Sequence, residues 1–277
     1  MYYLKKNVIG KVPVLEISES EYIEITNAKK VLRCGLSIEE KFEILHSNFA
    51  EFESEASDEL ALQEAFNSAD YSKIFDFRIL AERRLANLLT STKTYVDQIP
   101  SAARDTFTNQ PEVLDIAKKY FHEAYDSCFE YRFMEMLRNH VQHNGIAVHS
   151  LNHSSKRTED GIVNEISLLA TKEQLVQNSK NKKVTLKEMP QKADLLKASK
   201  VYVQQLTNVH RRVRDLTSDN ILAARKVYEV AVLRYENLGG ESLGLTAFDS
   251  DNQHDGAISM TLEFDNVRLM LLKKNVL

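Results

Sequence analysis

The chain contains few residues that interrupt secondary structure. Among its 277 residues there are only 8 glycines and 4 prolines. Glycine permits backbone angles that other residues avoid, and proline lacks an N–H donor, so both are common in tight turns and at helix ends. Their scarcity argues against a fold of many short strands and turns. It favours long helices joined by a small number of loops.

Cysteines and long apolar runs are also scarce. The two cysteines, Cys34 and Cys128, lie far apart and outside any CxxC pattern. We therefore expect free thiols in a reducing compartment rather than a disulfide. No apolar stretch approaches the length that crosses a bilayer, and the opening residues MYYLKKNVIGKVP lack the apolar core of a secretory signal. These features predict a cytoplasmic protein without a membrane association.

The net charge and the missing motifs exclude several classes of function. The formal charge of −4 excludes a broadly basic, DNA-coating protein but allows a small basic cleft. The sequence has no GxxxxGK[ST], GxGxxG or GxSxG pattern. ATP hydrolysis, dinucleotide binding and serine hydrolase chemistry therefore have no support. Hydrophobic residues make up 43% and charged residues 27%, as in an ordinary soluble globular protein with a sizeable core.

Apolar residues at spacings of three and four predict that most of the chain is helical. In chain order, the expected helices start after Ser37, follow Asp58, run from Tyr71 to Asp97 before Pro100, from 112 to 125, from 128 to 143, from about 192 to 216, and from 218 to 237. Ser127 is expected to cap the helix that starts at 128. Gly145 is expected to follow its end in the left-handed conformation.

The remaining segments have strand-like patterns. A short strand is expected around Val12, Val14 and Ile17. Within an insertion at 146–190, residues 146–148 and 162–169 look like strands, with a hairpin loop between them and a solvated basic turn at 178–183. The alternating tail, 257–272, predicts a β-hairpin that turns at Asp265–Asn266.

The predicted fold class is mainly α: a helical bundle with a small β appendage from the N-terminus, the 146–190 insertion and the C-terminal tail. Three domains are expected. Residues 1–60 form an N-terminal segment with a short strand and a helix, and residues 61–240 form the helical bundle with its β insertion. Residues 241–277 form the β-hairpin tail.

The stretch FMEMLRNHVQHNG, residues 133–145, gathers polar groups at the end of an apolar helix. Each helical residue advances about 100°, so Asn139 and His143 lie one turn apart, opposite the buried face centred on Leu137. Arg138 lies at the edge of their face. A neutral histidine transfers protons near pH 7, and arginine offers bidentate donors to phosphate oxygens. Together with an amide, these groups suit metal-independent cleavage of RNA, whose own 2′-hydroxyl is the nucleophile.

The sequence RNHVQH resembles the signature of the HEPN superfamily (higher eukaryotes and prokaryotes nucleotide-binding), an arginine followed after four to six residues by a histidine. The resemblance covers about residues 70–237. It implies Arg138 and His143 as the catalytic pair and Asn139 as the polar residue that often follows the arginine. It also implies an all-helical core, no cofactor, and a homodimer with facing motifs. The implied activity is metal-independent endoribonuclease cleavage by a toxin or antiphage effector.

Two functions therefore remain open. The first is this ribonuclease; the second is a non-catalytic helical module of the same type that binds a nucleotide or a protein partner such as an antitoxin. One helix supplies one arginine and one histidine, so a second copy across a two-fold axis would complete a denser site. We expect Arg132, Glu135, Asn139 and His143 to line a groove at or beside that interface.

Four further residues are predicted to bind substrate. Arg132 and Gln142 share the face of the motif. Arg211 and Arg212, in HRRVR at 210–214, would contact the phosphate backbone, although a solvated helix face is the simpler interpretation. Structural alternatives also exist for the motif itself. His143 could bind only the last helix carbonyls, and Arg138 could pair with Glu82 or Glu135.

The remaining histidines have a structural and a metal-binding interpretation. His140 faces the apolar side of its helix and is expected to pack at the edge of the core. Together, His140, His143, His149 and His153 provide four imidazoles within 14 residues, which suggests zinc. The first two point in different directions, however, and no cysteine or acidic residue is placed with them. No metal site is predicted.

Overall fold

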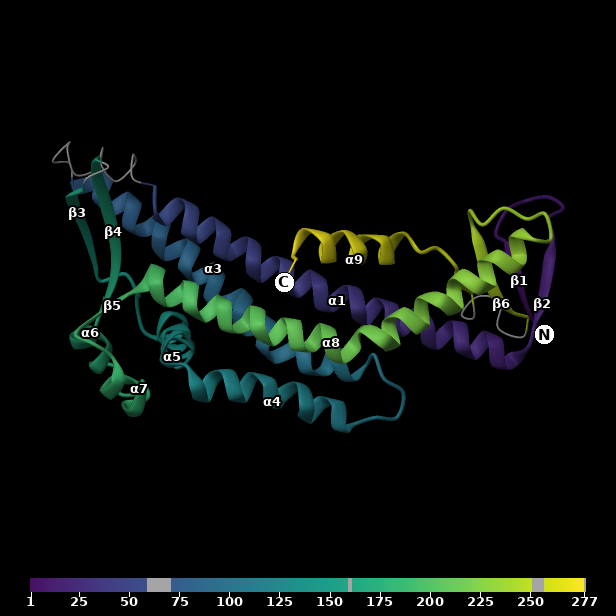
Figure 1. Ribbon diagram of the computed structural model, residues 1–277, viewed down its shortest axis with the longest axis horizontal. Coiled ribbons are helices and arrows are strands. Elements are labelled where there is room, and N and C mark those ends of the chain that lie inside the picture. Colours follow the sequence, from purple (N-terminus) through teal and green to yellow (C-terminus); the bar gives the residue numbers. More distant parts are fainter. Residues whose placement is uncertain (59–70, 159–160, 251–256, 277) are drawn as a thin grey trace. The chain divides into compact units, whose positions relative to one another are not determined.

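The computed structural model describes residues 1–58, 71–158, 161–250 and 257–276, without the side chains of 153–158 and 161–166. Figure 1 shows that helices dominate these residues, which confirms the mainly α fold. The helices are α1 (Glu19–Ala56), α3 (Tyr71–Arg104), α4 (Glu112–Ser127), α5 (Phe129–His143), α6 (Lys172–Val176), α7 (Lys183–Glu188), α8 (Leu195–Glu236) and α9 (Glu263–Lys274). The strands are β1 (Tyr2–Lys6), β2 (Val14–Ile17), β3 (Ser150–Thr158), β4 (Gly161–Thr171), β5 (Lys192–Asp194), β6 (Leu245–Asp249) and β7 (Ile258–Ser259).

The chain folds into two compact units, each built from separate segments. Unit 1 contains residues 1–40, 99–117 and 212–277, and unit 2 contains residues 41–98 and 118–211. Each unit holds its own antiparallel sheet. The order is β2-β1-β6-β7 in unit 1 and β3-β4-β5 in unit 2. The strands expected around Val14 and Ile17 and at 162–169 are present as β2 and β4, whereas residues 146–148 do not form the expected strand. The insertion forms a sheet separate from that of the N-terminus and the tail.

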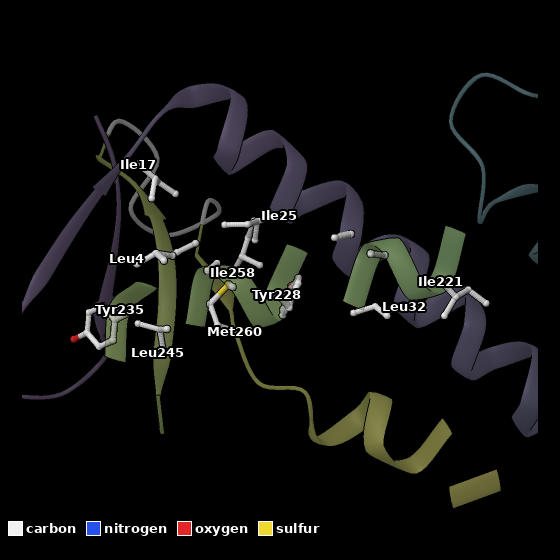
Figure 2. Packing of buried hydrophobic residues seen from close by; sticks show 14 residues of the cluster. Leu4, Ile17, Ile25, Leu32, Ile221, Tyr228, Tyr235, Leu245, Ile258 and Met260 are labelled. Carbon is white, nitrogen blue, oxygen red and sulfur yellow. The ribbon is translucent and has the colours of Figure 1, made fainter. Parts of the chain in front are cut away.

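The core of unit 1 lies between one face of its sheet and helices α1 and α8. Figure 2 shows Leu4 and Leu245 of the sheet facing Ile25 of α1 and Tyr228 of α8. Leu4 is fully buried, and β1 pairs with both β2 and β6 around it. Burying a large apolar side chain stabilises a fold by about 1.5–3 kcal/mol. The sheet is therefore held to the two helices mainly by apolar packing.

Helix α1 begins far earlier than its expected start after Ser37. Its first residue is Glu19, because Ser18 and Glu21 form a capping box. The Glu21 N–H donates to Ser18 Oγ (3.1 Å), and the Ser18 N–H donates to Glu21 Oε2 (2.7 Å). These two bonds satisfy donors that a helix start otherwise leaves free. The stretch expected after Asp58 lies outside the described residues.

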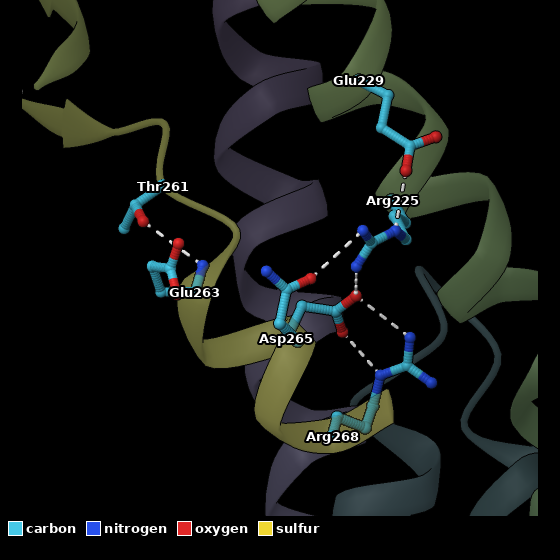
Figure 3. A network of polar contacts seen from close by, with 7 residues as sticks. Arg225, Glu229, Thr261, Glu263, Asp265 and Arg268 are labelled. Atoms are coloured by element: carbon cyan, nitrogen blue, oxygen red, sulfur yellow. Dashed lines mark hydrogen bonds and ion pairs between the residues drawn. The ribbon is translucent and has the colours of Figure 1, made fainter. Parts of the chain in front are cut away.

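Helix α9 replaces the expected β-hairpin of the tail, so that prediction is wrong. Asp265, the expected turn residue, is fully buried and binds the guanidinium groups of Arg225 and Arg268 (Figure 3). Burial alone would raise the pKa of Asp265, but the hydrogen bonds from Arg268 and Arg225 lower it overall. The spacing of three between Asp265 and Arg268 joins neighbours on a helix and not across a hairpin turn. Asp265 therefore fastens α9 to α8.

Two expected helix boundaries are also wrong. Helix α8 continues through 217–218, where Thr217 is buried and its hydroxyl donates to the Val213 carbonyl (2.9 Å) within the same helix. Helix α3 continues past Pro100 to Arg104. Ile99 and Ala103, on either side of the proline, are fully buried. Their packing offsets the hydrogen bond that proline removes, a loss of about 3 kcal/mol in a helix interior.

The middle insertion is more ordered than its sequence suggests. Residues 150–158, expected as a hairpin loop, form strand β3 and pair with β4 from Ser150↔Leu169 to Thr158↔Gly161. The turn at 178–183 exposes its three lysines, as expected, but it is docked onto the protein at Asn181. Asn181 is 5% exposed and donates to the Leu175 carbonyl (2.7 Å), and Lys182 donates to the Tyr125 hydroxyl (2.6 Å). Polar side chains here bind the protein itself.

Asp265→Asn should destabilise the protein by about 3–5 kcal/mol, because it leaves two arginines beside a neutral group, and Arg268 is buried. Urea unfolding at pH 7 measures this loss. Asp219→Asn is the matched control, since Asp219 is exposed on α8. A change below about 0.5 kcal/mol for Asp265→Asn, equal to that of a surface substitution, would contradict the anchoring role.

Candidate functional site

The candidate site lies at the end of α5, in unit 2. The helix buries one face, formed by Tyr131, Phe133, Met134, Met136, Leu137 and His140. Its N-cap is Cys128, without a side-chain cap, and the Ser127 hydroxyl binds the Ala124 carbonyl instead, so the expected Ser127 cap is wrong. The helix ends at Asn144 as expected, where the N–H groups of Asn144 and Gly145 both donate to the His140 carbonyl (2.8 and 3.2 Å). The left-handed conformation expected for Gly145 is not adopted.

The other face of α5 brings together four of the predicted site residues. Asn139, Gln142 and His143 are exposed, and Arg138 is half-buried. Arg138 Nη1 donates to Gln142 Oε1 (2.8 Å). Its Nε is buried and has no hydrogen-bond acceptor within the part of the chain that the structure describes. We call Arg138, Asn139, Gln142 and His143 the polar face of α5.

Arg132 and Glu135 do not join the polar face. Arg132 donates to the carbonyls of Tyr125 (3.0 Å) and Asp126 (2.7 Å) at the end of α4, and it pairs with Glu188 of α7. Glu135 accepts a hydrogen bond from the Tyr202 hydroxyl (2.7 Å). Both side chains therefore hold unit 2 together, and the expected groove reduces to Asn139 and His143. Substrate binding by Arg132 would have to break its present contacts.

Two further predicted substrate-binding arginines lie on α8, a different helix from the polar face of α5. Arg211, in unit 2, and Arg212, in unit 1, are both exposed on α8. Arg211 makes no hydrogen bond to α5 among the described residues. Their role in phosphate binding stays a prediction.

Glu82 of α3 fixes the chain where it leaves α5. Its carboxylate accepts hydrogen bonds from the backbone N–H groups of Ala147 (2.9 Å) and Val148 (2.8 Å). Both residues are fully buried, so their N–H groups need an acceptor from the protein. Because Glu82 and Glu135 have these other partners, neither forms the ion pair with Arg138 that the structural alternative requires. This role of Glu82 could not be predicted from local patterns, because Glu82 lies 65 residues before Ala147 in the chain.

A polar pocket of about 480 Å³ lies directly beyond the polar face. Its lining residues are Arg78, His140, Asn144, Gly145, Ile146, His149, Gln174, Gln177 and Asn178. His140 is buried, as expected, and its ring meets that of His149 edge-on, with 6.4 Å between centroids. His140 and His149 are nine residues apart in the sequence, and their rings meet because the chain turns back after α5. We call this cavity the amide pocket because four carboxamides line it.

Hydrogen bonds fix the two imidazoles of the amide pocket. His149 Nδ1 accepts from the Thr171 N–H (2.9 Å), so its Nε2 carries the proton and donates to the Ile146 carbonyl (3.1 Å). His140 Nδ1 faces the Asn178 amide at 3.3 Å. Burial lowers the pKa of both histidines, although a hydrogen bond with Ile146 acts in the opposite direction. Both rings are therefore neutral at pH 7.

These contacts do not test the expectation that the protein has no metal site. They do show where His140, His143 and His149 lie. Among the described residues, no group of three or more His, Cys, Asp or Glu side chains has the arrangement of a metal site. The side chain of His153 lies outside the described part. Cys34 and Cys128 form no disulfide, as expected.

Comparisons with known proteins leave the family open. No family model, no curated protein and no solved structure matches this chain. Within the described ranges, no helix is both long and apolar enough to cross a membrane. The arguments about function therefore rest on the polar face and the amide pocket themselves.

Glu82→Ala should destabilise the protein by about 2–6 kcal/mol, because each of two buried N–H groups loses its acceptor, at about 1–3 kcal/mol per group. Chemical denaturation measures the change. Asp76→Ala is the control, because Asp76 is exposed on the same helix. Equal stabilities of the two variants would show that the carboxylate is dispensable.

The neutral histidines predict a pH dependence of stability. In the unfolded chain both imidazoles gain protons near pH 6.5, whereas the folded protein resists this until a lower pH. The unfolded state then binds more protons, so the free energy of unfolding should fall as pH drops below about 6.5. Thermal melts from pH 7.5 to 5 measure the slope, which should flatten in the His140→Gln/His149→Gln double variant. His122→Gln, at an exposed position, should keep the wild-type slope.

Proposed function

We propose that this protein is a metal-independent endoribonuclease of the HEPN type, with Arg138, Asn139 and His143 as its catalytic residues. The observation that carries the proposal is the polar face of α5, where these side chains and Gln142 are gathered at one helix end. A half-buried arginine beside an exposed histidine offers both a phosphate ligand and a proton carrier. The resemblance of RNHVQH to the HEPN signature gives the same assignment.

The proposed reaction uses the 2′-hydroxyl of RNA as the nucleophile. The 2′-oxygen attacks the adjacent phosphorus, its proton passes to a base, and the bond to the 5′-oxygen of the next nucleotide breaks. His143 transfers a proton at one of these two oxygens. Arg138 binds the non-bridging oxygens as negative charge builds on them, and Asn139 orients the phosphate. The products are a 2′,3′-cyclic phosphate and a free 5′-hydroxyl.

Arg138 can leave its present contact at low cost. Its single hydrogen bond within the described residues goes to the side chain of Gln142, which is itself exposed. Its buried Nε has no acceptor there, and an unsatisfied buried donor costs about 1–3 kcal/mol. A phosphate could therefore draw the guanidinium away from Gln142 and satisfy more of its donors. Gln142 would then be free to contact the substrate.

The proposal includes a homodimer. A single polar face offers one arginine and one histidine on an exposed surface, and a second copy related by a two-fold axis would enclose the phosphate between two motifs. Enclosure removes water and strengthens the interaction of Arg138 with the phosphate. Such a nuclease would act on cytoplasmic RNA as a toxin or an antiphage effector, with an antitoxin as its partner. Light scattering at high concentration that reports only monomer would remove this part of the proposal.

RNA digestion with purified protein tests the activity. Cleavage should persist in EDTA, leave DNA of the same sequence intact, and produce 2′,3′-cyclic phosphate ends. His143→Ala should slow cleavage by about 10²–10⁴-fold, because a general acid–base group is lost. Arg138→Lys should also lose activity, since lysine retains the charge but not the two-pronged geometry. His140→Ala should fold less stably and still cleave, because His140 lies on the buried side.

His122→Ala is the matched control for His143→Ala, because His122 is an exposed histidine on α4. It should cleave at the wild-type rate. Full activity of His143→Ala, or complete loss of wild-type activity in EDTA, would show that the site is misassigned. A pure, folded protein that cleaves no RNA would instead favour the second function, a non-catalytic module for a nucleotide or a protein partner.

A further inference from the structure

A second, smaller cavity adjoins the amide pocket. This neighbour measures about 220 Å³ and is lined by Tyr71, Ile74, Phe75, Arg78, His149, Ser150 and Leu151. Arg78 and His149 line both cavities. The two cavities therefore adjoin in unit 2: carboxamides line the larger, aromatic rings line the smaller, and Arg78 lines both. We call the two adjoining cavities together the depression.

The histidines of this depression are walls rather than ligand-binding groups. His149 uses both ring nitrogens inside the protein, for the Thr171 N–H and the Ile146 carbonyl. The Nδ1 of His140 faces Asn178, whose own side chain also binds Asn181 and the Lys180 N–H. A ligand could reach these nitrogens only by breaking the bonds that shape the cavity. The pocket is thus already formed, as binding pockets usually are.

Arg78 supplies the positive charge of the depression. Its guanidinium lies over the ring of Phe75, 5.4 Å from the centroid, and has no carboxylate partner within the described ranges. No aspartate or glutamate is among the described residues that line either cavity. A guanidinium that has no carboxylate partner among the described residues and lies at the edge of a pocket is suited to an anion, and its planar shape matches two oxygens of a phosphate.

Arg78 lines both cavities, of which one contains aromatic rings and the other contains carboxamides. Tyr71 and Phe75 are 77% and 42% exposed and stand one turn apart on α3. In the larger cavity, the carboxamides of Gln174 and Gln177 are exposed, and neither has a hydrogen bond to another described side chain. Exposed aromatic rings stack on nucleobases, and carboxamides can pair with the donor and acceptor of an adenine edge.

We propose that this depression binds a nucleoside monophosphate unit: Arg78 holds the phosphate, while Tyr71, Phe75, Gln174 and Gln177 contact the base and ribose. A cavity of several hundred Å³ suits a ligand of this size. The unit can be a free nucleotide or one nucleotide of a single-stranded RNA. The pocket begins at Asn144, the residue after His143, so an RNA strand held here would pass the polar face. The binding proposal itself does not depend on cleavage.

Isothermal titration of the full-length protein with adenosine 5′-monophosphate tests the proposal. Arg78→Ala should weaken binding about 10- to 100-fold, through the loss of charge-assisted hydrogen bonds. Phe75→Ala should weaken it about 5- to 100-fold, through the loss of stacking. Two controls lie on the same helix outside the cavities: Arg83→Ala and Ile79→Ala, an exposed arginine and an exposed apolar residue. Both should bind as the wild type does, and thermal melts confirm that each variant is folded.

Further ligands separate the contribution of the base from that of the phosphate, and they show whether the bound unit is a free nucleotide or part of an RNA strand. Adenosine and ribose 5-phosphate should each bind at least about tenfold more weakly than the intact nucleotide, because each lacks one half of the recognition. A pentameric oligoadenylate, titrated against the His143→Ala variant, identifies the source. Tighter binding than the mononucleotide points to an RNA strand, and weaker binding points to a free nucleotide. The proposal is overturned if neither ligand binds, if ribose 5-phosphate binds as well as the nucleotide, or if Arg83→Ala weakens binding as much as Arg78→Ala.

Discussion

The contact of the Glu82 carboxylate with two backbone N–H groups determines the arrangement of the candidate site. Where α5 ends, Ala147 and Val148 enter the interior, and their donors would otherwise be left without acceptors. One acidic side chain satisfies both. It thereby sets the direction in which the chain continues into β3 and places His149 against His140. The buried wall of the amide pocket, and the exposure of His143 at the helix end, both follow from this turn of the chain.

The helical content was predictable because it depends on local signals. The apolar stripes of α3, α4 and α5 extend over many residues, and few glycines or prolines interrupt them. The start of α1 has a local signal in the Ser18 and Glu21 spacing of a capping box, although the clearest apolar pattern of this helix begins only after Ser37. The end of α3 could not be predicted from Pro100, because the burial of Ile99 and Ala103 overrides the tendency of proline to end a helix.

Tertiary contacts explain the clearest error of fold. The tail alternates apolar and polar residues, as a strand does, yet it forms α9. Two of the residues that decide this, Asp265 and Arg268, are charged and buried, and their partner Arg225 lies 40 residues earlier. A pattern of apolar residues cannot reveal a charged pair that belongs to the interior. Local charges did indicate a helix, because acidic residues occupy the first turn of α9 and lysines its last turn.

In the candidate site too, positions within one helix could be predicted from the sequence, whereas contacts between different elements could not. Helical spacing was sufficient to place Arg138, Asn139 and His143 on one face, because those residues share a helix. It also placed His140 on the buried side. It could not show that Arg132 and Glu135 bind Glu188 and Tyr202, or that Arg78 and His149 line the same cavities, because these pairs come from different elements.

The division of unit 1 into three chain segments has a consequence for biosynthesis. Strand β1 pairs with β6, more than 200 residues later, so β1 remains without this partner until residues 245–249 have left the ribosome. Both segments of unit 2 precede residue 212 and are complete before then. We therefore expect unit 2 to form first during synthesis. During that interval β1 is an unprotected strand edge, where a second nascent chain can pair with it.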